Sequence, residues 1–489
     1  MRSLISKQHP LSGQKALANV LQALSSAPPE DALAEAASLI ESSLGNPDMG
    51  ETERLRLLFA LDEATQPHVR GYIDHYLAAL REASPSKNLL WSAARSHWAL
   101  IFDAYGECLN AAATDKSLHV DAALAELAIR TIRSGTLRAK WDAFRHGPIE
   151  NSVWSRLNLA YRLAVRCGVQ HLPLQLRPGR ATETTAEREY LRAIAQHGVG
   201  PDQLDAERFE LAARLIHYVL HYLELTPTPN AASLHWLDCA LSLPPARIVN
   251  LPANATMPRF FSGMAAVHTL EELLDLVVAG EMPTALSVSG ENAHARVASV
   301  LSHIIRGWSN QPPQRRHRRH AMPGQLLVID GLTRFVARLS GDASDSALHT
   351  WTVRDASLQG IGAEAPLDDT ENLNVGTLVG MHSVDGDRWR IGAVRRMWRM
   401  SDKTGQVGIE LLGGAPVAAS ADDGANAVRV IVLEPLKRGQ PVRLAVPSPG
   451  PRQGEPLYLL DHGKAVKLTP VTTLEYGTDF EIRAYLVAP

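Results

Sequence analysis

The chain has 489 residues, 45% of them apolar and 21% charged, which is the composition of a globular protein with more than one core. Its formal net charge of -3 argues against a protein that binds nucleic-acid polymers, because such proteins need a basic excess. No apolar run reaches the ~18–20 residues that span a bilayer, so we expect no membrane insertion.

Cysteine usage and the N-terminal sequence predict a cytoplasmic protein. Cys108, Cys167 and Cys239 are widely spaced and odd in number, so neither a disulfide framework nor a C-x-x-C metal pair can be built from them. The N-terminal residues lack the apolar stretch of a signal peptide. We therefore expect reduced thiols and a cytoplasmic location.

Residues 1–310 are predicted to form a large, all-α region, either a bundle or a stack of helix pairs. Leu17, Val20, Leu21 and Leu24 recur at three- and four-residue spacing, the period of one face of a helix. Proline-containing breaks separate the segments, because the residue before a proline disfavours helix. The longer helices are expected at residues 89–112, 120–144, 153–169 and 204–225.

Two histidines in this region raise the alternative of an enzyme. His217 and His221 stand at i and i+4, which would place both imidazoles on one face of a helix. A zinc protease of this pattern needs a glutamate after the first histidine, and Tyr218 stands there instead. Packing histidines are therefore the favoured interpretation, and an unrecognised enzyme in the helical region stays as an alternative function.

A segment of one charge sign follows the helical region. No acidic residue lies between Glu291 and Asp330, whereas Arg315, Arg316 and Arg319 fall within this segment. In a protein of nearly neutral charge such a segment indicates an anion site, and an exposed basic linker is the alternative.

From residue 311 onward the pattern becomes that of short strands. Alternating apolar runs are separated by Gly, Asp, Asn and Pro, which indicates a barrel or sandwich. Residues 311–416 are expected to form one β unit, residues 417–427 a linker and residues 428–489 a small C-terminal β domain. Strands are predicted at residues 326–329, 333–339, 350–354, 388–400, 407–412, 428–433, 442–446, 457–460 and 480–487.

Two short motifs accompany these strands, one just before the first strand and one leading a later strand. Arg315 to Arg319 contain R-x-x-x-R, and Asp355, Ser357 and Gly360 fit D-x-S-x-x-G. Together they resemble the signature of PilZ domains, the bacterial receptors for cyclic di-GMP, over residues 312–414. The resemblance implies a six-stranded antiparallel β-barrel for residues 311–416.

The resemblance also implies a binding site for cyclic di-GMP. Its arginine pair falls on Arg315 and Arg319, with Arg316 in the commonly doubled place, and its turn residues fall on Asp355, Ser357 and Gly360. Because four arginines crowd this segment, Arg316 and His320 form another possible pair. The stretch between the two motifs is long for the family, and residues 340–346 are interpreted as an insertion in a hairpin.

These residue types suit a ligand with two phosphodiesters and two guanines. An arginine guanidinium is planar and always charged, so it can bind phosphate or the guanine edge bidentately and stack on a base. Asp355 can accept from guanine N–H groups, while Ser357 can bond to the ligand or the backbone. Gly360 allows close approach of the ligand to the chain.

Trp389 and Trp398 among several arginines also resemble a surface for single-stranded nucleic acid, although strands that place tryptophan inside and arginine outside give the same pattern. No P-loop, G-x-S-x-G or Rossmann glycine pattern is present. The predicted function is a non-enzymatic cyclic di-GMP receptor or adaptor without a cofactor, acting on a protein partner through the helical region. The alternative is a PilZ-like scaffold that binds no nucleotide and acts only through proteins of the motility or surface machinery.

Overall fold

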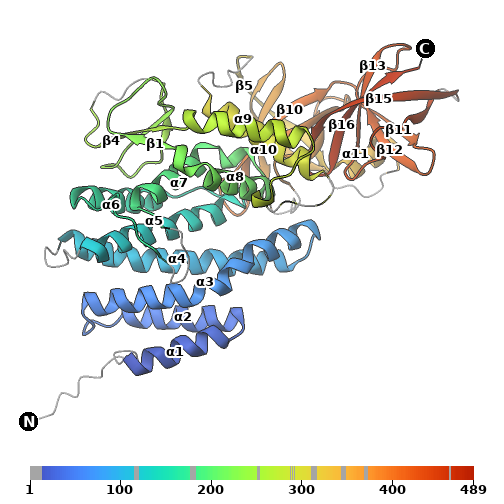
Figure 1. The fold of residues 1–489 in the computed structure, drawn as a ribbon. Helices are drawn as coiled ribbons and strands as arrows, with labels where there is room; N and C mark the ends of the chain where they lie inside the picture. Colours follow the sequence, from blue (N-terminus) through green and yellow to red (C-terminus); the bar gives the residue numbers. More distant parts are fainter. Residues whose placement is uncertain are drawn as a thin grey trace, which may run out of the picture.

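The N-terminal part of the protein is a stack of helices. The computed structural model describes residues 14–114, 121–176, 183–249, 254–286, 288, 290, 292–309, 317–342, 348–367, 373–461 and 464–488. The helices lie in successive layers, with the N-terminus at one end and the β structure at the other (Figure 1). They are α1 (Gln14–Ser26), α2 (Pro29–Leu44), α3 (Glu51–Arg81), α4 (Ser86–Thr114), α5 (Asp121–Ala143), α6 (Asn151–Arg166), α7 (Ala186–Gly198) and α8 (Ala206–Tyr218).

The interior of this stack is largely apolar but holds a buried ion-pair network. Arg130 of α5 is 4% exposed and contacts Asp62 at 2.9 Å, Glu63 at 2.6 Å and Glu126 at 2.8 Å. Tyr105 of α4 donates to Asp62 at 2.8 Å. These contacts join α3, α4 and α5. Arg130, Asp62 and Tyr105 are buried and need their partners to offset desolvation, whereas Glu63 and Glu126 are partly exposed.

The helical region also contains a small sheet that the sequence pattern did not predict. Its order is β1-β4-β2-β3, and it precedes α9 and α10. The predicted helix 204–225 is too long, since α8 ends at Tyr218 and residues 224–226 form an edge strand paired with β4. That partner is distant in sequence, so local periodicity could not reveal it. The elements are β1 (Glu224–Thr226), β2 (His235–Asp238), β3 (Ala246–Arg247), β4 (Pro258–Ser262), α9 (Met264–Val278) and α10 (Ala293–Trp308).

A closed barrel of six antiparallel strands follows, and we call it the first barrel. Its order is β10-β7-β6-β5-β8-β9, which confirms the predicted fold class. Trp351 and Val328 are fully buried within it. The strands are β5 (His320–Asp330), β6 (His349–Ser357), β7 (Gly360–Pro366), β8 (Leu378–Ser383), β9 (Arg390–Arg399) and β10 (Thr404–Gly413).

One predicted strand of this barrel is a helix. Residues 333–339 lie in α11 (Leu332–Leu339), and the buried side chains Leu332, Phe335 and Val336 follow helical spacing. The β-branched and aromatic residues there favoured a strand locally, but packing between two barrels overrides that preference. The insertion expected in a hairpin at 340–346 therefore follows a helix, and residues 343–347 lie outside the described residues.

The C-terminal β unit is itself a closed six-stranded barrel, which we call the second barrel. Its order is β11-β12-β13-β16-β15-β14. The linker predicted at 417–427 is wrong, because β11 begins at Val417 and pairs with β12 along its length. Alanine-rich polar sequence does not distinguish a linker from a strand whose partner is elsewhere. The strands are β11 (Val417–Asp422), β12 (Ala427–Val432), β13 (Pro441–Pro447), β14 (Leu457–Asp461), β15 (Lys464–Tyr476) and β16 (Phe480–Val487).

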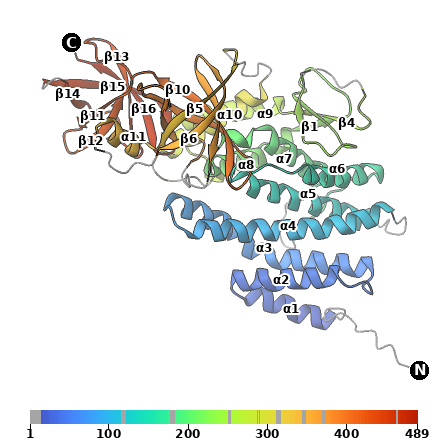
Figure 2. The same cartoon turned by 180° about the vertical axis from the view of Figure 1, so that it is seen from behind.

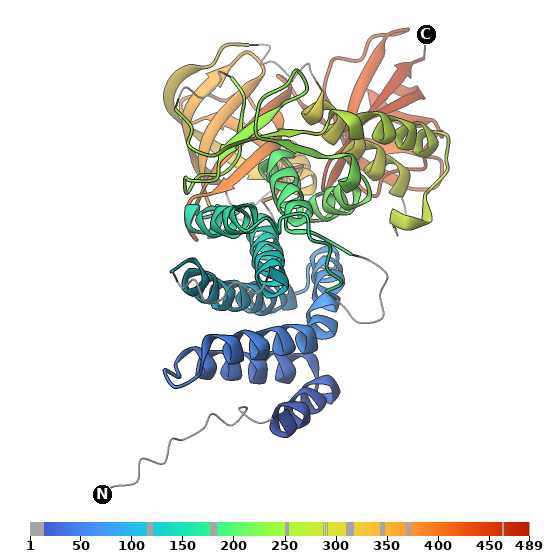
Figure 3. The ribbon, with the colours of Figure 1, turned by 60° about the vertical axis from the view of Figure 1, so that its left-hand side comes forward.

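The two barrels lie side by side over the end of the helical stack (Figures 2 and 3). Helix α11 packs between them. Asp479 of the second barrel accepts backbone N–H groups of Leu332 at 2.5 Å and Leu378 at 3.2 Å in the first barrel. Burial raises the pKa of Asp479, partly offset by these two hydrogen bonds. The barrels are therefore held together by buried polar contacts as well as apolar packing.

Candidate functional site

The structure brings the two sequence motifs together on the outer wall of the first barrel. Arg319 precedes β5, while Asp355 and Ser357 lie on β6 and Gly360 begins β7. Arg319 Nη1 donates to Asp355 Oδ1 at 2.6 Å. The Ser357 hydroxyl donates to the Gly360 carbonyl at 3.3 Å and closes the β6–β7 turn. Of the predicted contact residues, Asp355 therefore contacts Arg319 directly, and Ser357 and Gly360 form the turn beside it.

The register of the arginine pair is only partly described. Arg315 and Arg316 lie outside the described residues, so the structure places neither the Arg315/Arg319 pair nor the Arg316/His320 pair as a whole. His320 begins β5 and pairs with Ala356 in the ladder. Arg319, not His320, is the residue that contacts Asp355.

Gly360, Gly362 and Gly408 are neighbours on this wall, and we call them the glycine patch. Gly360 and Gly362 of β7 stand opposite Glu410 and Gly408 of β10 in the antiparallel register. A Cβ atom added at Gly362 would lie 2.6 Å from Asp355 Oδ1 and 2.9 Å from Arg319 Nη1, so the ion pair lies directly over this glycine. Glycine at these positions gives a flat floor on which a ligand can rest against the backbone.

Two β-bulges bring further arginines to the same wall. The register shifts between Val353 and Asp355 on β6, which leaves Arg354 as the extra residue. It shifts again where Val394 and Arg396 face successive residues of β10, which leaves Arg395 unpaired in the ladder. Bulges redirect side chains and are frequent next to functional sites.

A cavity of about 880 Å³ lies over this wall. Such a volume lies within the ~300–1,000 Å³ range typical of small-molecule sites. Cations predominate among the charged groups that line it, which suits a doubly anionic ligand. Its lining includes His317, Arg319, Arg354, Asp355, Ser357, Gly360, Gly362, Arg395, Arg396, Trp398, Gly408 and Glu410 from the first barrel, and Asp202 from the helical region.

Sequence reasoning missed most of the far side of this cavity. Trp398 is 36% exposed on the outer face of β9, beside Arg396. Trp389 instead packs against Phe335 and His382, with ring centroids 5.4 and 4.4 Å apart. The two tryptophans therefore do not form one exposed stacking surface. The alternation of arginine and tryptophan along residues 395–398 was the available signal, but it did not say which face would meet the motif.

Two neighbouring arginines on β9 connect the cavity wall to the rest of the protein. Arg395 contacts Glu410 at 2.7 Å and Glu475 of the second barrel at 2.6 Å through a second nitrogen. Burial lowers the pKa of Arg395, but these carboxylates outweigh it and the pKa is raised. Arg396 faces Asp202, which follows α7, with 3.9 Å between Nε and Oδ2. The wall of the cavity is thus tied to both other parts of the fold.

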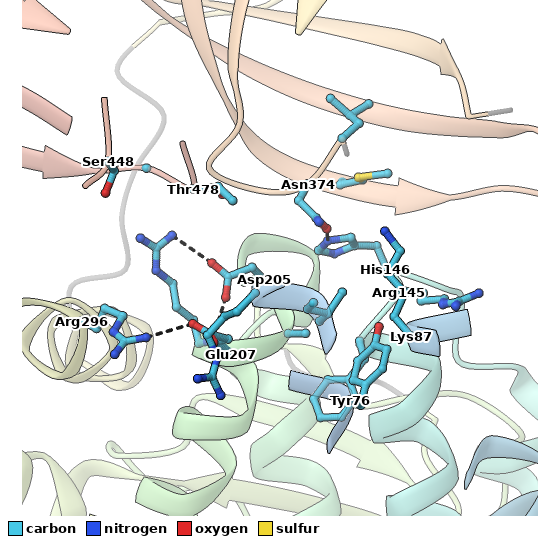
Figure 4. A pocket seen from close by; sticks show the side chains of 18 of the residues that line it. Tyr76, Lys87, Arg145, His146, Asp205, Glu207, Arg296, Asn374, Ser448 and Thr478 are labelled. Atoms are coloured by element: carbon cyan, nitrogen blue, oxygen red, sulfur yellow. Dashed lines mark hydrogen bonds and ion pairs between the residues drawn. The ribbon is translucent and has the colours of Figure 1, made fainter. Parts of the chain in front are cut away.

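A second cavity, of about 600 Å³, lies where the helical region meets both barrels (Figure 4). His146, after α5, contacts Asn374 of the first barrel at 3.1 Å, and its carbonyl accepts from the Arg399 N–H at 2.8 Å. Arg208 of α8 donates to the Tyr476 carbonyl of the second barrel at 2.6 Å. Burial lowers the pKa of His146, so the neutral imidazole is the form packed at this junction.

The histidine pair of the helical region does not form a metal site among the described residues. His217 lies in the last turn of α8, but the helix ends at Tyr218 and His221 lies in the following 3-10 turn (Leu220–Tyr222). His217 Nδ1 lies 3.1 Å from an Arg192 nitrogen and accepts its N–H. Burial and the charge of Arg192 lower the pKa of His217. Cys108, Cys167 and Cys239 are all free thiols.

The fold and the wall of the first barrel define the class of protein. A closed six-stranded antiparallel barrel with D-x-S-x-x-G on its outer face, entered through an arginine-rich segment, is a PilZ domain. A family described as "Cyclic-di-GMP receptor FimW, middle PilZ domain" matches residues 335–419. A second, described as "Cyclic-di-GMP receptor FimW, N-terminal domain", matches residues 15–230. The chain belongs to the PilZ-domain family of cyclic di-GMP receptors.

These matches confirm the predicted family and the predicted ligand class, cyclic di-GMP. Asp355, Ser357 and Gly360 fall inside the matched range of the PilZ domain, whereas Arg319 precedes it. Both matched families are described as parts of a cyclic di-GMP receptor. No curated protein matches the chain. Among the described residues, no helix has the length and apolar character needed to cross a membrane.

Proposed function

We propose that this chain binds cyclic di-GMP in the cavity over the glycine patch of the first barrel. Arg319 and Asp355 would contact the ligand from their position over Gly362, and Ser357 and Gly360 would shape the turn beside them. The single observation that carries this assignment is the 2.6 Å contact between Arg319 and Asp355, residues 36 positions apart, on the floor of a cavity whose lining holds four arginines and three carboxylates. Arg315 and Arg316 are proposed to complete the arginine set.

The chemistry of each group suits one part of the ligand. Arg319 is partly exposed, with 31% of its side chain accessible, so it can turn from Asp355 toward a phosphate without unfolding the wall. Asp355 would then accept from the guanine N1–H and N2–H groups. Hydrogen bonds between charged partners contribute about 1.5–3 kcal/mol each, so a few such contacts support micromolar or tighter binding.

We further propose that ligand binding is coupled to the helical region, which would bind the protein partner. The arginine-rich segment joins α10 to β5 in the sequence, so a ligand that binds its arginines acts on the connection between the two parts. Arg396 on the cavity wall also faces Asp202 of the helical region. A ligand shifts such a junction only to the extent that it binds one arrangement more tightly than the other.

Calorimetric titration of the full chain with cyclic di-GMP tests the assignment. The wild type should bind, and Arg319→Ala should weaken binding by about a hundredfold or more, since a phosphate or base contact of a charged group is lost. Folding should be preserved, because a partly exposed ion pair contributes only ~0–1 kcal/mol.

Arg429→Ala provides a matched control. Arg429 forms an exposed ion pair with Asp342 at 2.8 Å, away from the cavity lining. Equal affinity of the wild type and an Arg315→Ala/Arg319→Ala variant would overturn the site. A folded wild type that binds no cyclic di-GMP but retains a protein partner would instead select the scaffold function.

A further inference from the structure

The helical region places one carboxylate at the cavity of the first barrel. Asp202 lies in the 3-10 turn Pro201–Gln203 that follows α7, and this turn packs against β9. Gly200 enters the turn with φ of +71°, a left-handed conformation that favours glycine. The backbone thus directs Asp202 to the cavity, where it is 26% exposed and faces Arg396.

One row across the barrel wall runs from Asp355 to Arg396, and Asp202 of the helical region faces Arg396 at the second end. The register pairs Asp355 with Gly362, Gly362 with Gly408, and Gly408 with Arg396, so the row crosses four adjacent strands. With ~4.8 Å between neighbouring strands, the row is about 14 Å long along the curved wall. Its middle carries only glycine.

The two ends of this row have the same chemistry. At one end Asp355 is paired with Arg319 at 2.6 Å, and at the other Asp202 faces Arg396 at 3.9 Å. Each end therefore offers a carboxylate beside a guanidinium. Trp398, exposed beside Arg396, adds an aromatic face at the second end. The site thus repeats, across two parts of the fold, for a ligand whose two halves are alike.

We propose that Asp202 recognises the second guanine of the bound dinucleotide, and this rests on the proposed function of the same cavity. A carboxylate accepts both N1–H and N2–H of guanine, whereas adenine presents no such donor pair on that edge. Arg396 keeps Asp202 ionised and oriented, because a carboxylate has lone pairs enough for a guanidinium and a base together. The helical region is then part of the binding site and contributes to ligand specificity.

Discrimination between ligands tests this better than affinity alone. Removing Asp202 also removes a negative charge near a dianion, which by itself strengthens binding. Cyclic di-GMP, cyclic di-AMP and the hybrid with one guanine and one adenine all carry two phosphodiester charges. This charge effect therefore cancels in the ratio of their affinities.

We expect the wild type to bind cyclic di-GMP about tenfold or more tightly than the hybrid, since a good bidentate base contact discriminates by about 5- to 150-fold. In Asp202→Ala this ratio should fall to about two, while cyclic di-AMP still binds weakly because Asp355 continues to select one guanine. Asp202→Asn, which preserves the size of the side chain, serves if the alanine variant unfolds, and its ratio should also fall.

Glu207→Ala is the matched control. Glu207 lies in the same part of the helical region, is 29% exposed and forms ion pairs with Arg81 and Arg296 outside this cavity. In this variant the ratio of the affinities for cyclic di-GMP and the hybrid should equal that of the wild type. The inference is overturned if Asp202→Ala discriminates as the wild type does, or if the wild type binds the hybrid and cyclic di-GMP equally. In either case the proposed function survives if Arg319→Ala still weakens cyclic di-GMP binding about a hundredfold or more, whereas a wild type that binds none of the three ligands overturns both.

Discussion

Replacing Gly362 with alanine would put a methyl group on the floor of the cavity. The added Cβ would lie 2.6 Å from Asp355 Oδ1 and 2.9 Å from Arg319 Nη1, so both side chains must move by several tenths of an ångström. Both are about one third exposed and have room to turn outward. The strain is therefore about 1 kcal/mol or less, and the loss of glycine's backbone freedom in the unfolded chain offsets about 0.5–1 kcal/mol of it.

This variant should consequently lose binding affinity while keeping most of its stability. We expect a midpoint of thermal unfolding within a few degrees of the wild type, but cyclic di-GMP binding weakened by about 10- to 100-fold. The methyl group would raise the ligand off the floor and displace the arginine–aspartate pair at the same time. Calorimetry and thermal unfolding of the same samples measure both quantities.

Gly408→Ala is the companion variant. The nearest atom to its added Cβ is Arg396 Cβ at 3.4 Å, an ordinary contact, so this methyl group occupies the floor without disturbing the Arg319–Asp355 pair. It should weaken binding less than Gly362→Ala, by threefold to tenfold. Unchanged affinity in both variants would refute the assignment of the glycine patch as the ligand floor, and a large loss of stability in Gly362→Ala would refute the separation of strain from binding.

Three further predictions concern the rest of the fold. Arg130→Met should lower the free energy of unfolding of the helical region by about 3–5 kcal/mol in urea titration, because it leaves Asp62 buried without its cationic partner; a loss below 1 kcal/mol would contradict this. Burial lowers the pKa of His97 to about 4, below the ~6.5 of the unfolded chain, so its contribution to stability is present above pH 6.5 and is lost toward pH 4, by roughly 3 kcal/mol. His97→Gln should flatten that part of the stability profile. A double-mutant cycle on Arg395 and Glu475 should give about 1 kcal/mol of coupling between the barrels, and additivity would exclude this link.

Local sequence predicted the elements that are stabilised within themselves. The helix at residues 121–143 and the strand pattern of β10 carry their own periodicity, so their positions could be read directly. The strand predicted at residues 333–339 was wrong because their apolar spacing suits a strand or a helix, and only contact with both barrels selects the helix. The linker predicted at residues 417–422 was wrong because pairing with β12, and not their composition, makes them a strand.

The candidate site divides in the same way. Arg319, Asp355, Ser357 and Gly360 were found from the sequence because short motifs carry their own turn and charge chemistry. Gly408 was not found from the sequence, because its place in the site follows only from its pairing with Gly362 in the strand register.

The sequence by itself determined the helical and β halves of the chain, the barrel and the motif residues that suit a guanine dinucleotide. Only the tertiary structure decided that Asp202 reaches the same cavity and that Arg395 and Arg396, adjacent in sequence, contact different parts of the fold. The physical reason is the separation along the chain over which each determinant acts. Periodicity and turn chemistry act over a few residues, whereas strand register, bulges and docking between domains depend on groups that only the folded chain brings together.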